Sequence, residues 1–330
     1  MQTLTQYEYL DRDMILRGVV DWLVKESPLL GALSMKSVQG NSLKYNVSLT
    51  LPTAAWSAVG DPITESTGTF EQRSTDIYTL IQNAYTDKAS IALNATQNPE
   101  AIDAALAAQA MAHEFEKTLI IGQTSVDTTT KQFKGLLRTV AELESATTTD
   151  LDAINNDQVI AGTTSTGALT MASMDELVDQ IKPGKPDLLL MSRRSRRKLN
   201  VLSRASGSSG LELNDSKLFG SKMMHYDETP IYVSDWLLDN YTEGSSSVQA
   251  ISTYDFDSAA VAGTNENTII FAMQIGEDKV TGLHAGEMAH ERGTLVEDYN
   301  AILNRYVWYV GLACFKKFSL ACMTGTNPRD

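Results

Sequence analysis

The sequence has little cysteine. Cys314 and Cys322 are the only two cysteines in 330 residues, which excludes a disulfide framework, and no Cys-x-x-Cys pair suited to a metal occurs. Free cysteines are usually buried and behave as small apolar side chains, so we expect both on one face of a C-terminal strand. This cysteine usage implies folding in a reducing cytoplasm.

Long apolar runs are also missing. The longest candidate, residues 306–314, is about half of the ~18 residues that a membrane span requires. The first residues, MQTLTQYEYLDRD, lack both a basic start and an apolar stretch, so we expect no signal peptide. Both absences argue against a membrane partner.

Positive charge is scarce, with 27 lysines and arginines against 41 acids and a net charge of -14. An acidic surface repels polyanions, which argues against a general nucleic-acid-binding protein. Hydrophobic residues make up 42% and charged residues 21% of the chain, as in ordinary folded proteins, so overall disorder is excluded. A length of 330 residues is typical of two domains or lobes.

Catalytic signatures are absent as well: the sequence has no phosphate loop, dinucleotide fingerprint, nucleophile elbow or zinc-binding helix. One weak candidate is a hydrolase or metal site that uses His284, Glu287 and His290, with the two histidines on one face of an expected strand and the acid on the other. A metal needs three or more convergent ligands, and a histidine near glycines in a strand-rich region is more often structural. We therefore expect no enzyme activity, no cofactor and no metal.

Two N-terminal stretches predict elements that cannot bury their own apolar residues. Residues 13–25 predict a helix whose stripe is Met14, Ile15, Val19, Trp22 and Leu23. Residues 42–49 and 75–80 alternate polar and apolar as strands do, and the turn-rich stretch between them contains Trp56, so an extended hairpin is expected. Such elements are marginal alone in water, so we expect both to pack on neighbouring subunits.

The clearest helix is predicted for residues 99–121. Asn98 serves as a cap, proline and an acid suit the first turn, and Gly122 ends the helix. Its apolar stripe is formed by Ala104, Ala108, Met111, Phe115 and Leu119. His113 and Lys117 share a helix face, which we interpret as a subunit contact rather than a catalytic base.

The rest of the chain indicates an α+β fold without the strict alternation of a doubly wound sheet. A short helix is expected at 174–181 and strands at 186–191, 230–234, 268–272 and from 280 to 324.

An arginine-rich helix, SRRSRRKLN, follows the strand at 186–191. Arg193, Arg197 and Arg204 fall on one face of this helix, and Leu199 and Leu202 fall on nearly the opposite one. Three interpretations stay open. The commonest is a solvated face, the second is a contact with acids on a neighbouring subunit, and the third is contact with DNA.

Several stretches, in this order, resemble the major capsid proteins of tailed phages with the Hong Kong ninety-seven type fold. HEFEKTLIIGQ (113–123) is similar to the end of that family's spine helix, and KQFKGLL (131–137) to its phenylalanine–x–glycine–leucine turn. PDLLLMSRRSRRKL (186–199) is similar to a strand and helix of its axial domain, and DETPIYVSD (227–235) to its proline-containing strand. ACFKKFSLACMTGT (313–326) is similar to the closing strand of its peripheral domain.

The resemblance implies a division of almost the whole chain. It gives an N-arm (1–38), an extended loop (39–82), a peripheral domain (83–137 with 275–326), an axial domain (138–274) and a tail (327–330). The candidate subunit contacts are then Trp22, Trp56, His113, Lys117, Arg193 and Arg197.

The implied function is structural: self-assembly into hexamers and pentamers of an icosahedral phage head that encloses double-stranded DNA without sequence specificity. The implied partners are further copies of the chain and a portal, with separate scaffolding and decoration proteins left open. The implied location is the virion, after assembly in the host cytoplasm. An encapsulin-like nanocompartment, which shares the fold but houses enzymes, is the first alternative, and the hydrolase is the second.

Overall fold

The computed structural model describes residues 28–62, 65–93, 99–124, 131–143, 156–161, 168–205, 216–218, 221–237, 268–286, 288–293 and 299–326. The helix expected at 13–25 with Trp22, the Asn98 cap and Glu287 lie outside these ranges.

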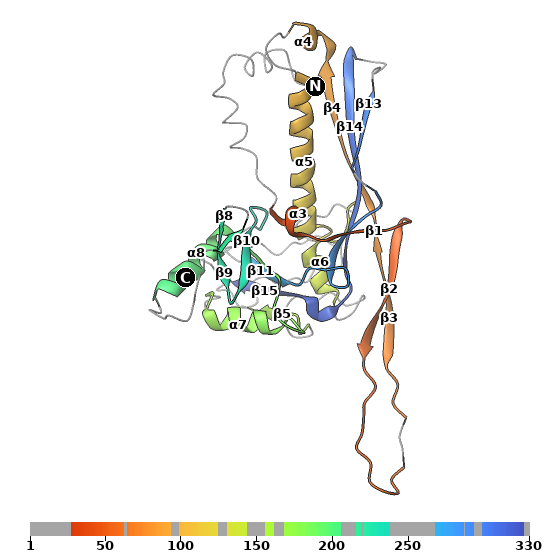
Figure 1. The fold of residues 1–330 in the computed structure, drawn as a ribbon, viewed down its shortest axis with the longest axis vertical. Helices are drawn as coiled ribbons and strands as arrows, with labels where there is room; N and C mark the ends of the chain where they lie inside the picture. Colours follow the sequence, from red (N-terminus) through yellow and green to blue (C-terminus); the bar gives the residue numbers. More distant parts are fainter. Residues whose placement is uncertain are drawn as a thin grey trace.

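One long helix, α5 (Pro99–Ile121), forms the spine of the molecule (Figure 1). Its 23 residues match the predicted range and correspond to a length of about 34 Å. Met111, Phe115 and Leu119 of the predicted stripe are buried, whereas Ala108 is exposed. The large apolar side chains therefore fix the C-terminal half of the helix in the core.

The spine sheet packs along α5 and has five strands. They are β1 (Met35–Ser37), β12 (Val280–His284), β14 (Ala301–Cys314), β13 (Ala289–Gly293) and β4 (Tyr78–Asp87). The long strand β14 is central, because β4 pairs with it on one side and β12 and β13 pair with it on the other, all antiparallel. Phe115 of α5 meets Trp308 of β14 with ring centroids 4.9 Å apart.

A two-stranded hairpin, β2 (Ser42–Thr50) and β3 (Thr69–Asp76), projects away from the body (Figure 1). The hairpin was predicted from the alternation of residues 42–49. The second strand differs from its predicted range, because the structure divides 75–80 between β3 and β4 at Ile77. Ile77 is buried, and the chain passes at this residue from the hairpin into the spine sheet.

The lobe sheet has six strands in the order β5-β15-β11-β6-β10-β9. Their bounds are β5 (Val159–Ala161), β15 (Leu320–Thr326), β11 (Thr268–Met273), β6 (Leu188–Met191), β10 (Thr229–Val233) and β9 (His225–Tyr226). Both β6 and β11 are completely buried. This explains their continuous apolar sequences, because strands covered on both faces do not alternate.

The two faces of the lobe sheet belong to two cores. Leu188 and Leu190 of β6 join the cluster that contains Phe115 of α5, whereas Leu189 and Met191 join a second cluster. Two helices cover that second face, α7 (Met171–Asp179) and α8 (Arg193–Ala205). The spine sheet and the lobe sheet thus share the first core, and α7 and α8 lie on the opposite side of the lobe from α5.

The shorter elements connect these parts. They are α3 (Pro28–Ala32), α4 (Lys88–Leu93), α6 (Leu136–Ala141), the strand pair β7 (Ser216–Leu218) and β8 (Ser221–Met223), and the η1 turn (Lys317–Ser319). Within the described ranges, every helix is too short or too polar to cross a membrane.

The two cysteines occupy different sheets. Cys314 ends β14, the η1 turn intervenes, and Cys322 lies in β15, so the expectation of one shared strand was wrong. Both are free and buried, and both belong to the first core cluster.

We expect neither thiol of the folded protein to react with Ellman's reagent at mildly alkaline pH. Burial raises the pKa of the Cys314 thiol to about 11 and also raises the pKa of Cys322, so little thiolate forms, and the reagent has no access. The check is the absorbance of released thionitrobenzoate before and after addition of guanidinium chloride. Rapid reaction of either thiol without denaturant would contradict this core assignment.

Candidate functional surfaces

The tip of the hairpin exposes large apolar side chains. Leu51 is 82%, Trp56 105%, Val59 109% and Phe70 76% exposed. Several large apolar side chains exposed on one segment of a soluble protein usually mark a contact with another molecule. Trp56, a predicted subunit contact, thus lies at a position where it touches almost nothing of its own chain.

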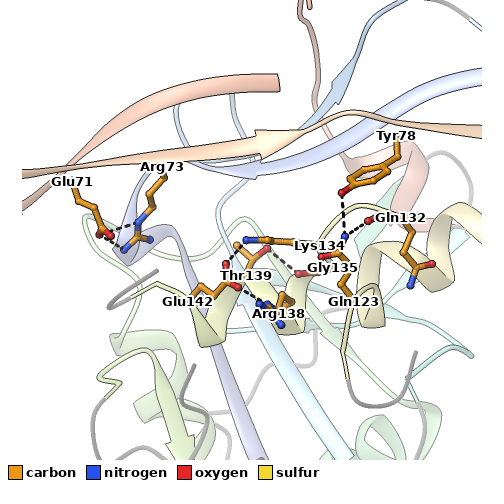
Figure 2. A network of polar contacts seen from close by, with 10 residues as sticks. All are labelled: Glu71, Arg73, Tyr78, Gln123, Gln132, Lys134, Gly135, Arg138, Thr139 and Glu142. Atoms are coloured by element: carbon orange, nitrogen blue, oxygen red, sulfur yellow. Dashed lines mark hydrogen bonds and ion pairs between the residues drawn. The ribbon is translucent and has the colours of Figure 1, made fainter. Parts of the chain in front are cut away.

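The base of the hairpin is held firmly against the body (Figure 2). The Arg73 guanidinium donates to the Leu143 carbonyl over 2.8 Å and pairs with Glu71 at 3.2 Å. On the other strand, the Tyr45 ring packs edge-on against Phe315 at 5.0 Å, and burial raises its pKa. The hairpin therefore has a fixed root and an unsupported tip.

A polar cluster below this root involves α6. The Glu142 carboxylate accepts hydrogen bonds from Lys134, at 2.7 Å, and from Arg138 (Figure 2). Lys134 and Glu142, together with Tyr45 and Arg73, line a cavity of about 160 Å³. Sequence reasoning missed the cluster, since nothing in the order of residues 71–73 and 134–142 indicates that they meet.

Two glycines meet at the end of α5. The Gly135 amide donates to the Gly122 carbonyl at 2.9 Å, and a Cβ added at Gly135 would lie 2.5 Å from the Gly122 nitrogen. Gly122 was predicted as a helix-ending glycine, but the structure gives a different reason for it, namely close approach of two backbones. Nearby, Gln123 donates to the Gln132 carbonyl and lies 3.4 Å from the Tyr78 hydroxyl (Figure 2).

The N-terminal end of α5 is fastened to the spine sheet by charge. The Arg292 guanidinium donates twice to Glu100, at 2.7 and 3.0 Å, and the Asn304 amide donates to the same carboxylate at 3.2 Å. The Asn304 oxygen then faces His290, whose Nε2 lies 3.0 Å away and must carry the proton. His290 also stacks on Tyr306 at 4.7 Å.

We expect the substitution Glu100→Gln to lower the midpoint of thermal unfolding slightly at neutral pH and to have less effect in acid. The hydrogen bond from Arg292 holds the pKa of Glu100 below its ordinary value. A depressed carboxyl pKa adds stability above the unfolded-state pKa, and this stability is lost as the pH falls through the folded-state pKa. Calorimetry of both proteins over a pH series checks this; an unchanged difference at acidic pH would contradict it.

The histidines of the weak catalytic candidate lie in separate strands. His284 ends β12 and His290 lies in β13, and the two strands pair with different parts of β14. The His284 Nδ1 lies 3.1 Å from the Gly286 carbonyl. In the described part of the chain, no three histidine, cysteine or acidic side chains are grouped to hold a metal ion. Each described histidine therefore has a structural contact, and the expectation that they share one strand was wrong.

His113 and Lys117 of α5 lie beside the lobe. The His113 ring is 6.5 Å from that of Trp236, and Lys117 pairs with Glu114 at 3.7 Å. Sequence reasoning missed the neighbouring Glu116, which is 1% exposed and accepts a hydrogen bond from Ser234. This face of α5 is thus used at least in part for contacts within the chain.

The arginine-rich helix α8 has the predicted faces. Leu199 is fully buried, whereas Arg196, Arg197 and Arg204 are exposed. Arg193 is also exposed, but its guanidinium makes a two-pronged pair with Asp235, at 2.6 and 3.0 Å, which fastens the start of α8 to the segment after β10.

An apolar pocket of about 380 Å³ lies between α5 and the β1 side of the spine sheet. Its lining includes Met35, Met111, Met288 and Trp308, with His284 at its border. Among the described residues that line it, His284 is the single titratable side chain.

The phage capsid family model matches residues 9–276. Similar solved structures include the holo-SrpI encapsulin complex of Synechococcus elongatus PCC 7942, at 15% identity over 97% of both chains and a TM-score of 0.65. The capsid of an empty GTA particle is similar at 11% identity over 92% of both chains, with a TM-score of 0.65. A structure from Mycobacterium phage Adephagia is similar at 14% identity over 98% of both chains, with a TM-score of 0.58. No curated protein sequence matches significantly.

Proposed function

Because the chain belongs to the phage capsid family, we propose that it is a major capsid protein of a tailed phage, forming the hexamers and pentamers of an icosahedral head around double-stranded DNA. The family membership makes it a capsid shell protein with a structural role. The proposal adds the ring sizes, the DNA content, the portal as partner and assembly in the host cytoplasm.

The observation that carries the proposal is the hairpin with a fixed root and an exposed apolar tip. Trp56 and Val59 gain nothing from this position in an isolated chain, since both are fully solvated. They become useful when they cover apolar surface on a second copy, and a shell supplies such a copy to every subunit. We propose that this hairpin is the extended loop expected at residues 39–82.

We further propose that α5 with the spine sheet forms the peripheral domain and that the lobe sheet with α7 and α8 forms the axial domain. In this proposal residues 320–326 belong to the axial domain, because β15 pairs with β11 and β5 of the lobe sheet. Residues 1–38 remain the proposed N-arm, residues 327–330 the tail, and Trp22 a proposed contact of that arm.

An encapsulin-like compartment is the second candidate, favoured by the similarity to the encapsulin complex along nearly the whole chain. The two functions differ in content: a phage head encloses DNA, whereas a compartment encloses a cargo protein. The hydrolase alternative has lost its support in the described region, where His284 and His290 are held by separate structural contacts.

Negative-stain electron microscopy of the purified full chain, with and without a co-expressed scaffolding protein, tests the shell function. We expect closed shells, and in phage-producing cells the shells should contain nuclease-protected DNA. Monomers under every condition would overturn the shell function. Shells filled with a co-purifying enzyme and no DNA would select the compartment instead.

A further inference from the structure

Several charged side chains around the lobe sheet are already paired within the chain. The pairs are Lys185 with Asp227 and Glu228, Arg193 with Asp235, Lys279 with Asp187, and Lys317 with Asp157. The exposed charged side chains that remain outside these pairs are those that a second molecule could bind.

Two helices of the lobe carry exposed charges without such a pair. Arg196, Arg197 and Arg204 lie on α8, and Glu176 and Asp179 lie on α7; among the described residues, none of these five side chains has an ion pair. The neighbouring acid Asp175 accepts a hydrogen bond from the Tyr226 hydroxyl, which holds α7 against β9. One helix therefore presents cations and the other presents anions.

The two charged faces point outward because the opposite faces are locked in the core. Met174 and Leu177 anchor α7, and Leu199 anchors α8, all in the second core cluster. Figure 1 shows α8 at the left edge of the lobe and α7 along its lower edge, so the two helices, which cover the same face of the lobe sheet, lie at different edges of the lobe. A lobe that carries positive charge at one edge and negative charge at another suits head-to-tail contact between identical copies.

We propose that the arginine face of α8 in one copy binds the acidic face of α7 in the next copy around a ring. This inference rests on the proposed shell function and names the pair of surfaces that closes its rings. The partner is a second copy of this chain, because one chain supplies both faces and no other partner is needed for complementarity. Free solvation of α8 and contact of α8 with packaged DNA are the competing outcomes of the test.

Two variants test the contact by making both faces alike. Arg197→Glu with Arg204→Glu gives acidic faces on α7 and α8, and Glu176→Lys with Asp179→Lys gives basic faces on both. We expect each variant alone to lose closed shells by about tenfold or more, because like charges would meet at every contact. All four positions are exposed, so the midpoint of thermal unfolding should stay unchanged.

Combining the variants gives results specific to this pairing. One chain that carries all four substitutions has its charges exchanged and should form closed shells again. A co-expressed mixture of the two variants should form rings with an even number of copies, where the variants alternate. A ring with an odd number must place two like faces together, so the mixture should yield hexamers, as sheets or tubes, without pentamers and without closed shells.

Electron microscopy and native mass spectrometry measure these products, and Lys131→Glu with Lys316→Glu, two exposed positions that belong to neither α7 nor α8, is the control for net charge. Normal shells from each variant alone would overturn the contact while leaving the shell function intact. Shells that lack DNA are a further possible product of the α8 variant. If the chain with all four substitutions also forms shells without DNA, the arginines contact DNA instead. Absence of shells from the unaltered chain would refute the shell function itself.

Discussion

Replacing Gly135 with alanine is expected to abolish stable folding. The added Cβ would lie 2.5 Å from the Gly122 nitrogen, 2.7 Å from the Thr118 carbonyl and 2.9 Å from the Ile120 carbonyl. All three neighbours are backbone atoms of α5 or its end, so no side chain can move aside. Overpacking of this kind costs about 3 kcal/mol or more, a large fraction of the stability of a typical domain. Soluble yield and the urea midpoint of any folded fraction measure the loss.

Gly31→Ala is the matched control for this substitution. Gly31 lies in α3, and an added Cβ would meet nothing within 4 Å. Alanine in a helix is favoured over glycine by roughly 0.5–1 kcal/mol, so this variant should be as stable as the parent or slightly more stable. Equal stability of the Gly31 and Gly135 variants would show that the close approach after α5 does not exist.

Replacing Trp56 and Val59 with serine is expected to prevent assembly without destabilising the subunit. Both side chains are fully exposed, so their loss should change the free energy of unfolding by less than about 0.5 kcal/mol. In a shell each copy would lose a large apolar anchor in its contact with the next subunit. An aromatic anchor typically contributes roughly 2 kcal/mol or more to the free energy of such a contact. Sedimentation should therefore show the shell fraction falling by more than about tenfold, while circular dichroism gives an unchanged melting curve.

Ser57→Ala is a suitable control for the tip, because it changes an exposed polar residue between the two apolar ones. It should assemble as the parent chain does. Normal shells from the Trp56 and Val59 variant would mean that the tip does not contact another subunit, and the exposed apolar residues would then need a different explanation.

The elements that the sequence predicted well are those whose signals are local. Helix α5 was placed to the residue because proline, an early acid and a regular apolar stripe all mark the same segment. The hairpin and the faces of α8 followed from alternation and helical spacing, which depend only on neighbouring residues. The fully buried strands β6 and β11 were predicted because a short, continuous apolar run between turn residues is typical of a strand covered on both faces.

The features that were missed depend on pairs far apart in the chain. Arg193 meets Asp235 and Arg73 meets Leu143, and nothing in either segment specifies the other. Gly122 follows the last residue of α5 as predicted, but its close approach to the Phe133 carbonyl, 2.6 Å from an added Cβ, could not be predicted for the same reason. The placement of β15 in the lobe sheet likewise depends on β11 and β5 rather than on its own sequence.

The junction at Ile77 determines how load travels through the molecule. Only this buried residue separates β3 of the hairpin from β4, and β4 is in register with β14 from Tyr78 to Asp87. Its amide donates to the Asn41 carbonyl at 2.9 Å, which clamps the two hairpin strands together at the root. The hairpin is thus continuous with the spine sheet and fixed at its root rather than joined to it by a flexible linker. A torque applied at the tip of the hairpin must therefore bend the spine sheet.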